Sequence, residues 1–268
     1  MIGIDPLKKV IEATLVSPYI KDEKPVSLLI VAKPEAGKTS AIKLYRENKG
    51  ICYITDATPF GLTRDILPKL VSGEIKTIMI ADLLTPLSKS TKTRKAFVAF
   101  LNNLIEEGVA KITTYSMIWE REVKTNVITA ITDEELADGR HEWATMGFLS
   151  RFLIFSYSYP MDTVSRILEY YSEKPPLFPA EKLNLPGGEV DIGLSKNIAD
   201  KLDPLAVAMG LRYNVYGIRA KINLRTFIKA LAYLNNRTEA TDEDLTELLN
   251  LSQWLNPDLM PLEARGHD

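Results

Sequence analysis

The fold of this chain is decided by the stretch Leu28-Leu29-Ile30-Val31-Ala32-Lys33-Pro34-Glu35-Ala36-Gly37-Lys38-Thr39-Ser40. Its first residues are apolar and predict a buried strand, its middle is a loop with proline and glycine, and residues 40–47 favour a helix. Strand, loop and helix in this order are the context of a phosphate-binding loop. Ala32 replaces the first glycine of the pattern G-x-x-x-x-G-K-[ST], so an ordinary strand-to-helix turn is the alternative.

A loop of this kind binds anions through its backbone N–H groups and the start of the following helix. Gly37 would let the backbone approach phosphates without a Cβ in the way. Lys38 would reach the β- and γ-phosphates, and the Thr39 hydroxyl would hold Mg²⁺. The motif therefore predicts binding of ATP with Mg²⁺. The residues expected to form the nucleotide site are Ala32, Lys33, Pro34, Glu35, Ala36, Gly37, Lys38, Thr39 and Ser40.

Composition sets broad limits on the function. The chain has 268 residues, enough for a large α/β domain and a smaller one, and a formal net charge of −2. That charge argues against a globally basic surface for nucleic acid, but it permits a local one. Cys52 is the only cysteine, which excludes an internal disulfide. The chain has only two histidines, which argues against a histidine metal site. No apolar run approaches membrane-spanning length and no secretory signal is visible, so the expected location is cytoplasmic.

A second apolar run, at residues 75–81, ends in Asp82 and is typical of a Walker B strand. The Asp82 carboxylate would face Mg²⁺ together with Thr39; the alternative is a strand-ending or helix-capping aspartate. The next position commonly carries a glutamate that orients the attacking water, and here it is Leu83. Loss of that carboxylate predicts hydrolysis slower by roughly 10²- to 10⁴-fold. On this basis Leu83→Glu is expected to raise kcat.

The remaining pattern predicts the fold class. Apolar strands alternate with helical segments, which indicates a mostly parallel five-stranded sheet covered by helices on both faces. The strands are expected at residues 28–32, 51–55, 75–82, 126–131 and 152–155. Helices are expected at residues 5–15, 40–47, 64–71 and 94–107, with Asp5 as the N-cap of the first, and a hairpin is expected at about residues 119–122.

Prolines and glycines cluster at residues 173–188, which indicates a linker. Only helical patterns follow it, at residues 194–202, 204–209, 224–235 and 242–251. We therefore expect three parts: an α/β P-loop domain at residues 1–172, the linker at 173–188, and a small all-helical lid domain at 189–268.

Four further segments carry a family resemblance. They are Ile2-Gly3 with Lys8-Lys9, Tyr53-Ile54-Thr55 with Gly61-Leu62-Thr63, Gly147-Phe148-Leu149-Ser150-Arg151-Phe152, and Asn223-Leu224-Arg225 with Thr241-Asp242-Glu243-Asp244-Leu245. With the P-loop and the Walker B-like strand, they resemble the ATPase domain of minichromosome maintenance (MCM) helicases, a branch of the AAA+ ATPases. The resemblance implies an AAA+ P-loop fold and ATP hydrolysis.

The same resemblance implies roles for three residues. Arg151 would be an arginine finger that reaches the ATP of a neighbouring copy, although a surface arginine is the alternative. Thr132 takes the sensor-1 position, where a hydroxyl could orient a water or a phosphate oxygen. Arg225 takes the sensor-2 position, with Arg219 as a rival. A finger that acts in trans implies head-to-tail assembly into a ring, such as a hexamer, or an open spiral.

The resemblance also implies action on DNA, as a replication helicase motor or a helicase-loader-like factor. Lys111, Arg121 and Lys124 lie on or near the predicted hairpin and would contact the phosphate backbone. Two alternatives stay open. One alternative to action on DNA is an ATP-gated assembly module with little hydrolysis, which Leu83 favours. The other is an AAA+ remodeller that acts on a protein partner.

Overall fold

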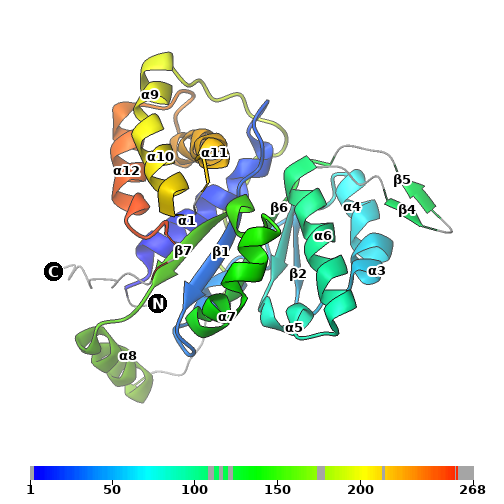
Figure 1. The fold of residues 1–268 in the computed structure, drawn as a ribbon. Helices are drawn as coiled ribbons and strands as arrows, with labels where there is room; N and C mark the ends of the chain where they lie inside the picture. Colours follow the sequence, from blue (N-terminus) through cyan, green and yellow to red (C-terminus); the bar gives the residue numbers. More distant parts are fainter. Residues whose placement is uncertain are drawn as a thin grey trace.

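The computed structural model describes residues 3–107, 112–114, 117–119, 123–173, 179–212, 215–256 and 258. Its centre is a five-stranded sheet with the order β2-β3-β6-β1-β7, in which every pair of neighbours is parallel (Figure 1). The predicted parallel sheet is thereby confirmed. The strands are β1 (Ser27–Ala32), β2 (Ile51–Ile54), β3 (Thr77–Ile80), β6 (Asn126–Ile131) and β7 (Phe152–Tyr157).

Helices cover both faces of the sheet, because successive strand side chains point to opposite sides. Leu28 and Ile30 join the core beneath α1 (Asp5–Val16) and α2 (Lys38–Lys43), whereas Leu29 and Val31 join the core on the other face. The second core is closed by α4 (Leu67–Val71), α5 (Leu84–Leu87), α6 (Thr91–Glu107) and α7 (Asp133–Thr145). Short helical turns complete this part of the chain: η1 (Ser17–Tyr19), α3 (Pro59–Gly61), η2 (Leu62–Ile66) and η3 (Leu149–Arg151).

Several boundaries differ from the sequence predictions. The helix expected at residues 64–71 is divided between the π turn η2 and α4. The hairpin lies earlier than predicted, since β4 (Ile112–Thr114) pairs antiparallel with β5 (Met117–Trp119). The helices α7 and α8 (Met161–Glu173) were not predicted. Asp5 is the first residue of α1 rather than its N-cap, and no side chain caps that end.

The part after the linker is helical as predicted. It consists of α9 (Lys196–Lys201), α10 (Asp203–Arg212), α11 (Ile218–Leu234) and α12 (Asp242–Ser252). Leu224, Phe227 and Leu231 of α11 are fully buried in the same core as Leu7 and Ile11 of α1. The lid therefore shares the core of the α/β part. No helix in the described part of the chain is long and apolar enough to cross a membrane.

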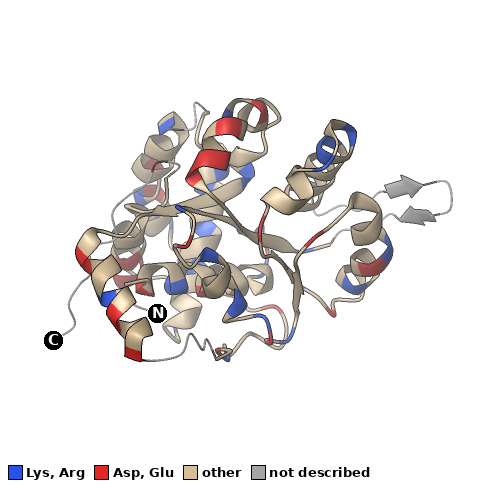
Figure 2. Ribbon diagram, turned by 90° about the horizontal axis from the view of Figure 1, so that it is seen from below, with Lys and Arg blue, Asp and Glu red and all other residues tan. Residues whose placement is uncertain are grey.

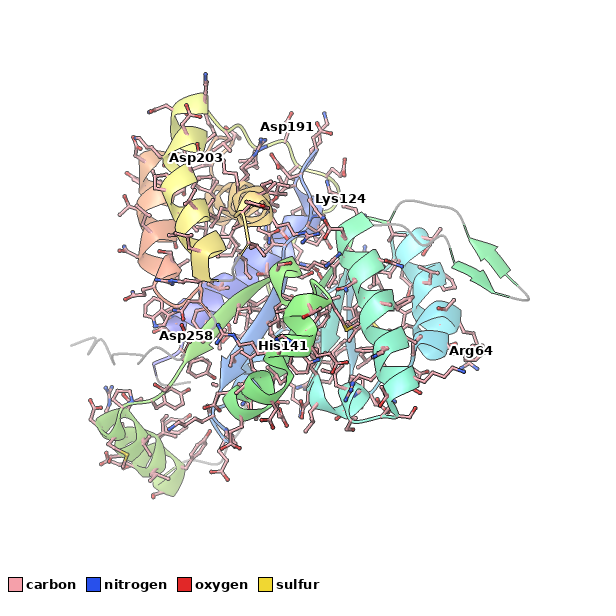
Figure 3. All side chains as sticks on the ribbon, viewed as in Figure 1. Arg64, Lys124, His141, Asp191, Asp203 and Asp258 are labelled. Carbon is pink, nitrogen blue, oxygen red and sulfur yellow. The ribbon has the colours of Figure 1, made fainter. Side chains whose placement is uncertain are left out.

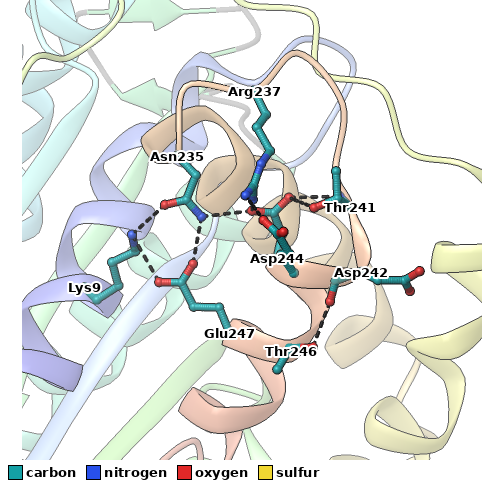
Figure 4. A network of polar contacts seen from close by, with 9 residues as sticks. Lys9, Asn235, Arg237, Thr241, Asp242, Asp244, Thr246 and Glu247 are labelled. Atoms are coloured by element: carbon teal, nitrogen blue, oxygen red, sulfur yellow. Dashed lines mark hydrogen bonds and ion pairs between the residues drawn. The ribbon is translucent and has the colours of Figure 1, made fainter.

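A polar network reinforces this contact (Figure 4). The buried Asp244 carboxylate accepts hydrogen bonds from Asn235 (2.9 Å) and Arg237 (2.6 Å), and Lys9 of α1 donates to Asn235 (3.1 Å). Burial raises the pKa of Asp244, but hydrogen bonds from Asn235 and Thr241 and the charge of Arg237 hold it below its usual value. Asp244 thus stays ionised and joins the turn before α12 to α11, whose end is tied to α1.

The described part of the predicted linker, residues 179–188, is fastened to the end of α2. The N–H of Glu181 donates to the carbonyl of Leu44 (2.6 Å), and Asn48 Nδ2 donates to the Glu181 carbonyl (2.8 Å). The Glu181 carboxylate also pairs with Lys8 of α1 at 2.7 Å. This segment therefore packs against the first helix and the helix of the P-loop.

Leu83 changes one expectation. Its side chain is 0% exposed and lies in the core under α4–α7, and its N–H donates to the Ala130 carbonyl of β6 (2.9 Å). A glutamate at this position would place a carboxylate in an apolar core, where the charged form is strongly disfavoured. The expectation that Leu83→Glu raises kcat therefore does not fit the structure.

We now predict that Leu83→Glu lowers stability by about 2 kcal/mol or more without raising the rate of ATP hydrolysis. Leu84→Glu is the matched control, because Leu84 is 39% exposed. Urea unfolding of both variants measures the difference. A Leu83→Glu protein as stable as the control would contradict this packing.

Candidate functional site

The loop between β1 and α2 has the backbone of a phosphate cradle. Gly37 has a φ of 83°, in the left-handed region that side chains disfavour, and Glu35 has a φ of 62°. The N–H of Ala36 donates to the Lys33 carbonyl (3.3 Å), which closes a tight turn. No side chain of the described residues caps the start of α2, so the N–H groups there can bind an anion.

Two tyrosines that the sequence analysis missed hold this loop from the last strand. The hydroxyls of Tyr157 and Tyr159 both donate to the Ala36 carbonyl, at 2.8 and 3.1 Å. Burial raises the pKa of Tyr159 to about 12 and that of Tyr157 well above its usual value, so both remain neutral donors. The available signal was their spacing, since Tyr157 ends β7 and Tyr159 follows it two residues later.

Lys38 is the first residue of α2, and its side chain reaches back to the carboxyl end of β1. Its Nζ donates to the carbonyls of Ala32 and Lys33, each at 2.8 Å. Burial lowers the pKa of Lys38, and the carboxylates of Asp133 and Asp82 partly offset that effect. The amine of Lys38 therefore lies where β1 ends and the loop begins, near the carboxylates of Asp133 and Asp82.

Asp82 and Thr39 meet at the same edge of the sheet. The Thr39 hydroxyl is 3.5 Å from the carbonyl of Ala81, the residue before Asp82. One Asp82 oxygen accepts the N–H of Leu84 (2.9 Å). A hydroxyl and one carboxylate are the oxygen ligands that Mg²⁺ takes when phosphates supply others. Among the described residues, no group of three His, Cys, Asp or Glu gathers to hold a metal without such help.

Thr132 lies between these two groups, because β6 separates β1 from β3. It follows the last residue of β6 and caps α7: its Oγ1 accepts the N–H of Glu135 (3.2 Å), and its own N–H donates to Glu135 Oε2 (3.0 Å). The hydroxyl hydrogen is not needed for this capping box. The sensor-1 role of Thr132 stays a prediction, at a position adjacent to the loop.

Arg151 lies at the opposite edge of the sheet, directly before β7. Its Nε is 3.0 Å from Glu106, which also pairs with Arg219 (3.0 Å) and Lys24 (3.3 Å). Burial raises the pKa of Glu106, but the charges of Lys24, Arg219 and Arg151 bring it below its usual value. These side chains line a cleft between α6 and α11 in which cations outnumber carboxylates.

Arg225 lies at this edge as well. It pairs with Glu23 at 2.9 Å, and Lys229 pairs with the same carboxylate at 2.7 Å. Glu23 precedes β1, whose six residues span about 20 Å. Neither Arg151 nor Arg225 can therefore reach the P-loop of its own chain.

The residues predicted to contact DNA are only partly described. Lys111 and Arg121 lie outside the described residues. Lys124, labelled in Figure 3, donates to the Ile20 carbonyl and pairs with Glu189 at 3.0 Å, so it joins the segment before β6 to the residue that follows the predicted linker. Basic and acidic residues are interspersed over the described helices (Figure 2).

We predict that Lys38→Ala weakens binding of ATP with Mg²⁺ by about 10- to 100-fold, because a charge-assisted contact to phosphate is lost. Lys43→Ala is the control, since Lys43 is an exposed cation of the same helix. Equilibrium titration measures both affinities. Equal affinity of Lys38→Ala and wild type would overturn the P-loop assignment.

Comparison with known protein families finds a match in the helical part that follows the linker. Residues 205–252, which cover most of α10 and all of α11 and α12, match the family model described as AAA lid domain. No curated protein matches the chain in sequence. The parallel sheet flanked by helices, together with this lid, gives the chain an α/β fold of the AAA+ type followed by a helical lid.

Proposed function

We propose that this chain is an ATPase that binds ATP with Mg²⁺ at the carboxyl edge of its sheet. The observation that carries the proposal is the convergence of the P-loop, Asp82 and Thr132 on the ends of three adjacent parallel strands. Ligands of open α/β sheets bind at this edge. The match to an AAA lid domain supports the same assignment.

Each group at this edge has a distinct task. The backbone N–H groups of the loop from Lys33 to Thr39, except at Pro34, which has none, cradle the phosphates. Lys38 exchanges its contacts with Ala32 and Lys33 for the β- and γ-phosphates. Thr39 and Asp82 hold Mg²⁺, which supplies charge stabilisation to the transferred phosphoryl group. Thr132 follows β6, the strand between β1 and β3, and its hydroxyl orients a phosphate oxygen or a water.

We further propose that copies assemble head to tail. Arg151 lies at the edge opposite its own P-loop, so it can serve only a neighbour's ATP. The cleft around Glu106 holds Lys24, Arg151 and Arg219, and its excess positive charge suits the phosphates of a neighbouring nucleotide. A heterologous contact of this kind closes into a ring, such as a hexamer, or continues as a spiral.

The substrate that best fits the sequence resemblance is DNA. An MCM-like helicase motor or a loader-like factor would contact it through Lys111, Arg121 and Lys124, the basic residues on or near the hairpin predicted from the sequence. Leu83 lies in the core, where it cannot orient a water, so an ATP-gated assembly module with little hydrolysis remains an alternative. Because basic and acidic residues are interspersed, a remodeller that acts on a protein partner remains a second alternative.

Arg151→Ala should abolish the part of the ATPase rate that rises with protein concentration, a loss of about 10³-fold at full assembly. Binding of ATP should be unchanged. Arg151→Lys keeps the positive charge beside Glu106 but lacks the planar fork, so we expect it to preserve the melting temperature and still lose the rate. Arg64→Ala is the control, because Arg64 is exposed on the far side from the lid (Figure 3). Full activity of Arg151→Lys at every concentration would contradict the trans finger.

If DNA is the substrate, affinity for a DNA duplex or single strand should fall steeply with salt. Lys111→Ala and Arg121→Ala should each reduce the slope of log Kd against log salt by about 1. Lys201→Ala in the lid should leave the slope unchanged. No DNA affinity at low salt, with ATPase stimulated by an unfolded protein instead, would favour the remodeller.

A further inference from the structure

Hydrolysis at this edge requires a group that orients the attacking water, and two obvious positions are engaged elsewhere. Leu83 occupies the position next to Asp82 and is buried in the core. Asp82 itself accepts the N–H of Leu84 with one oxygen and is proposed to bind Mg²⁺ with the other. A carboxylate from another element would have to orient the water.

Three acidic residues follow β6, and the structure distinguishes them. Glu134 is exposed, and Glu135 is engaged in the capping box with Thr132. Asp133 differs from both. Its Oδ1 atom is buried and has no hydrogen-bond partner among the described residues. A buried carboxylate oxygen without a donor is costly unless a ligand, a water or an ion satisfies it.

The strand register places Asp133 beside the loop. Val31 of β1 pairs with Ile131, the last residue of β6, and Asp133 begins α7 two residues later. Lys33, whose carbonyl accepts a hydrogen bond from the Lys38 amine, lies two residues beyond Val31. Electrostatics agree with this placement. The charges of Asp133, Asp82 and Glu135 each raise the pKa of the Lys38 amine, against the effect of its burial. Asp133 thus lies near the group that is expected to contact the β- and γ-phosphates.

We propose that Asp133 orients the water that attacks the γ-phosphate and accepts its proton, in the task that a glutamate at position 83 would otherwise perform. The inference rests on the proposed ATPase function. The water oxygen bonds to the γ-phosphorus as the bond from that phosphorus to the β–γ bridging oxygen breaks, and the electron pair of that bond stays on ADP. The water proton passes to the Asp133 carboxylate and then to solvent, which leaves ADP and inorganic phosphate.

A structural role is the competing explanation. An acidic residue in the first turn of α7 stabilises the helix by about 0.3–1 kcal/mol through its dipole, without any contact to substrate. Stability and rate separate the two explanations, because the dipole effect changes the melting temperature and leaves the bond-breaking step unchanged.

The test compares Asp133→Asn with wild type in the full chain. We expect kcat to fall by about 10²- to 10⁴-fold. The affinity for the non-hydrolysable analogue adenylyl imidodiphosphate and the Mg²⁺ concentration at half-maximal rate should both stay within about threefold, since phosphate and Mg²⁺ contacts persist. Glu134→Gln is the matched control, one residue along the same helix turn, and should keep the wild-type rate.

Asp133→Glu restores a carboxylate and should keep at least about a tenth of the wild-type rate. It also decides the case if Asp133→Asn fails to fold. Equal rates in wild type and Asp133→Asn, or a folded Asp133→Glu as slow as the asparagine variant, would overturn the role of Asp133. A raised Mg²⁺ requirement in Asp133→Asn would also overturn it, in favour of metal binding. If wild type binds no ATP at all, the proposed ATPase function fails first, and titration alone reveals this.

Discussion

The parallel pairing of β6 with both β1 and β3 is the constraint on which the candidate site depends. Three neighbouring strands that run in the same direction end at the same edge, so the residues that follow them meet there. The P-loop follows β1, Asp82 follows β3, and Thr132 and Asp133 follow β6. Antiparallel placement of β6 would send Thr132 and Asp133 to the far edge, about 20 Å away.

The two edges of the sheet have complementary chemistry. The carboxyl edge combines Lys38 and loop N–H groups with the carboxylates of Asp82 and Asp133. At the amino edge, one cluster combines Lys24, Arg151 and Arg219 around the Glu106 carboxylate, and a second pairs Arg225 and Lys229 with Glu23. Such a half-buried cluster has more positive than negative charge, and an anion from another copy would balance it. In the head-to-tail assembly that we propose, these two edges would meet.

The lid is coupled to both edges. Its central helix, α11, packs on α1, carries Arg219 and Arg225 to the amino edge, and is connected to α12 through the buried Asp244. The linker is fastened to the end of α2 by Glu181 and Asn48. A movement of the lid relative to the sheet would have to disturb these contacts.

Much of this protein follows from sequence alone, because local signals specify it. The apolar runs predicted the five strands, and the helical patterns after the proline cluster predicted the helices of the lid. The phosphate-binding role of the Gly-Lys-Thr loop stays a prediction. Helix α7 was missed although its capping box, Thr132 with Glu135, is local and readable. What sequence could not give is which strand lies beside which. Only the register of β6 between its neighbours places Asp133 near Lys38, and only the packing of α4–α7 turns Leu83 into the core. Both depend on contacts between residues distant in the chain, which no local pattern encodes.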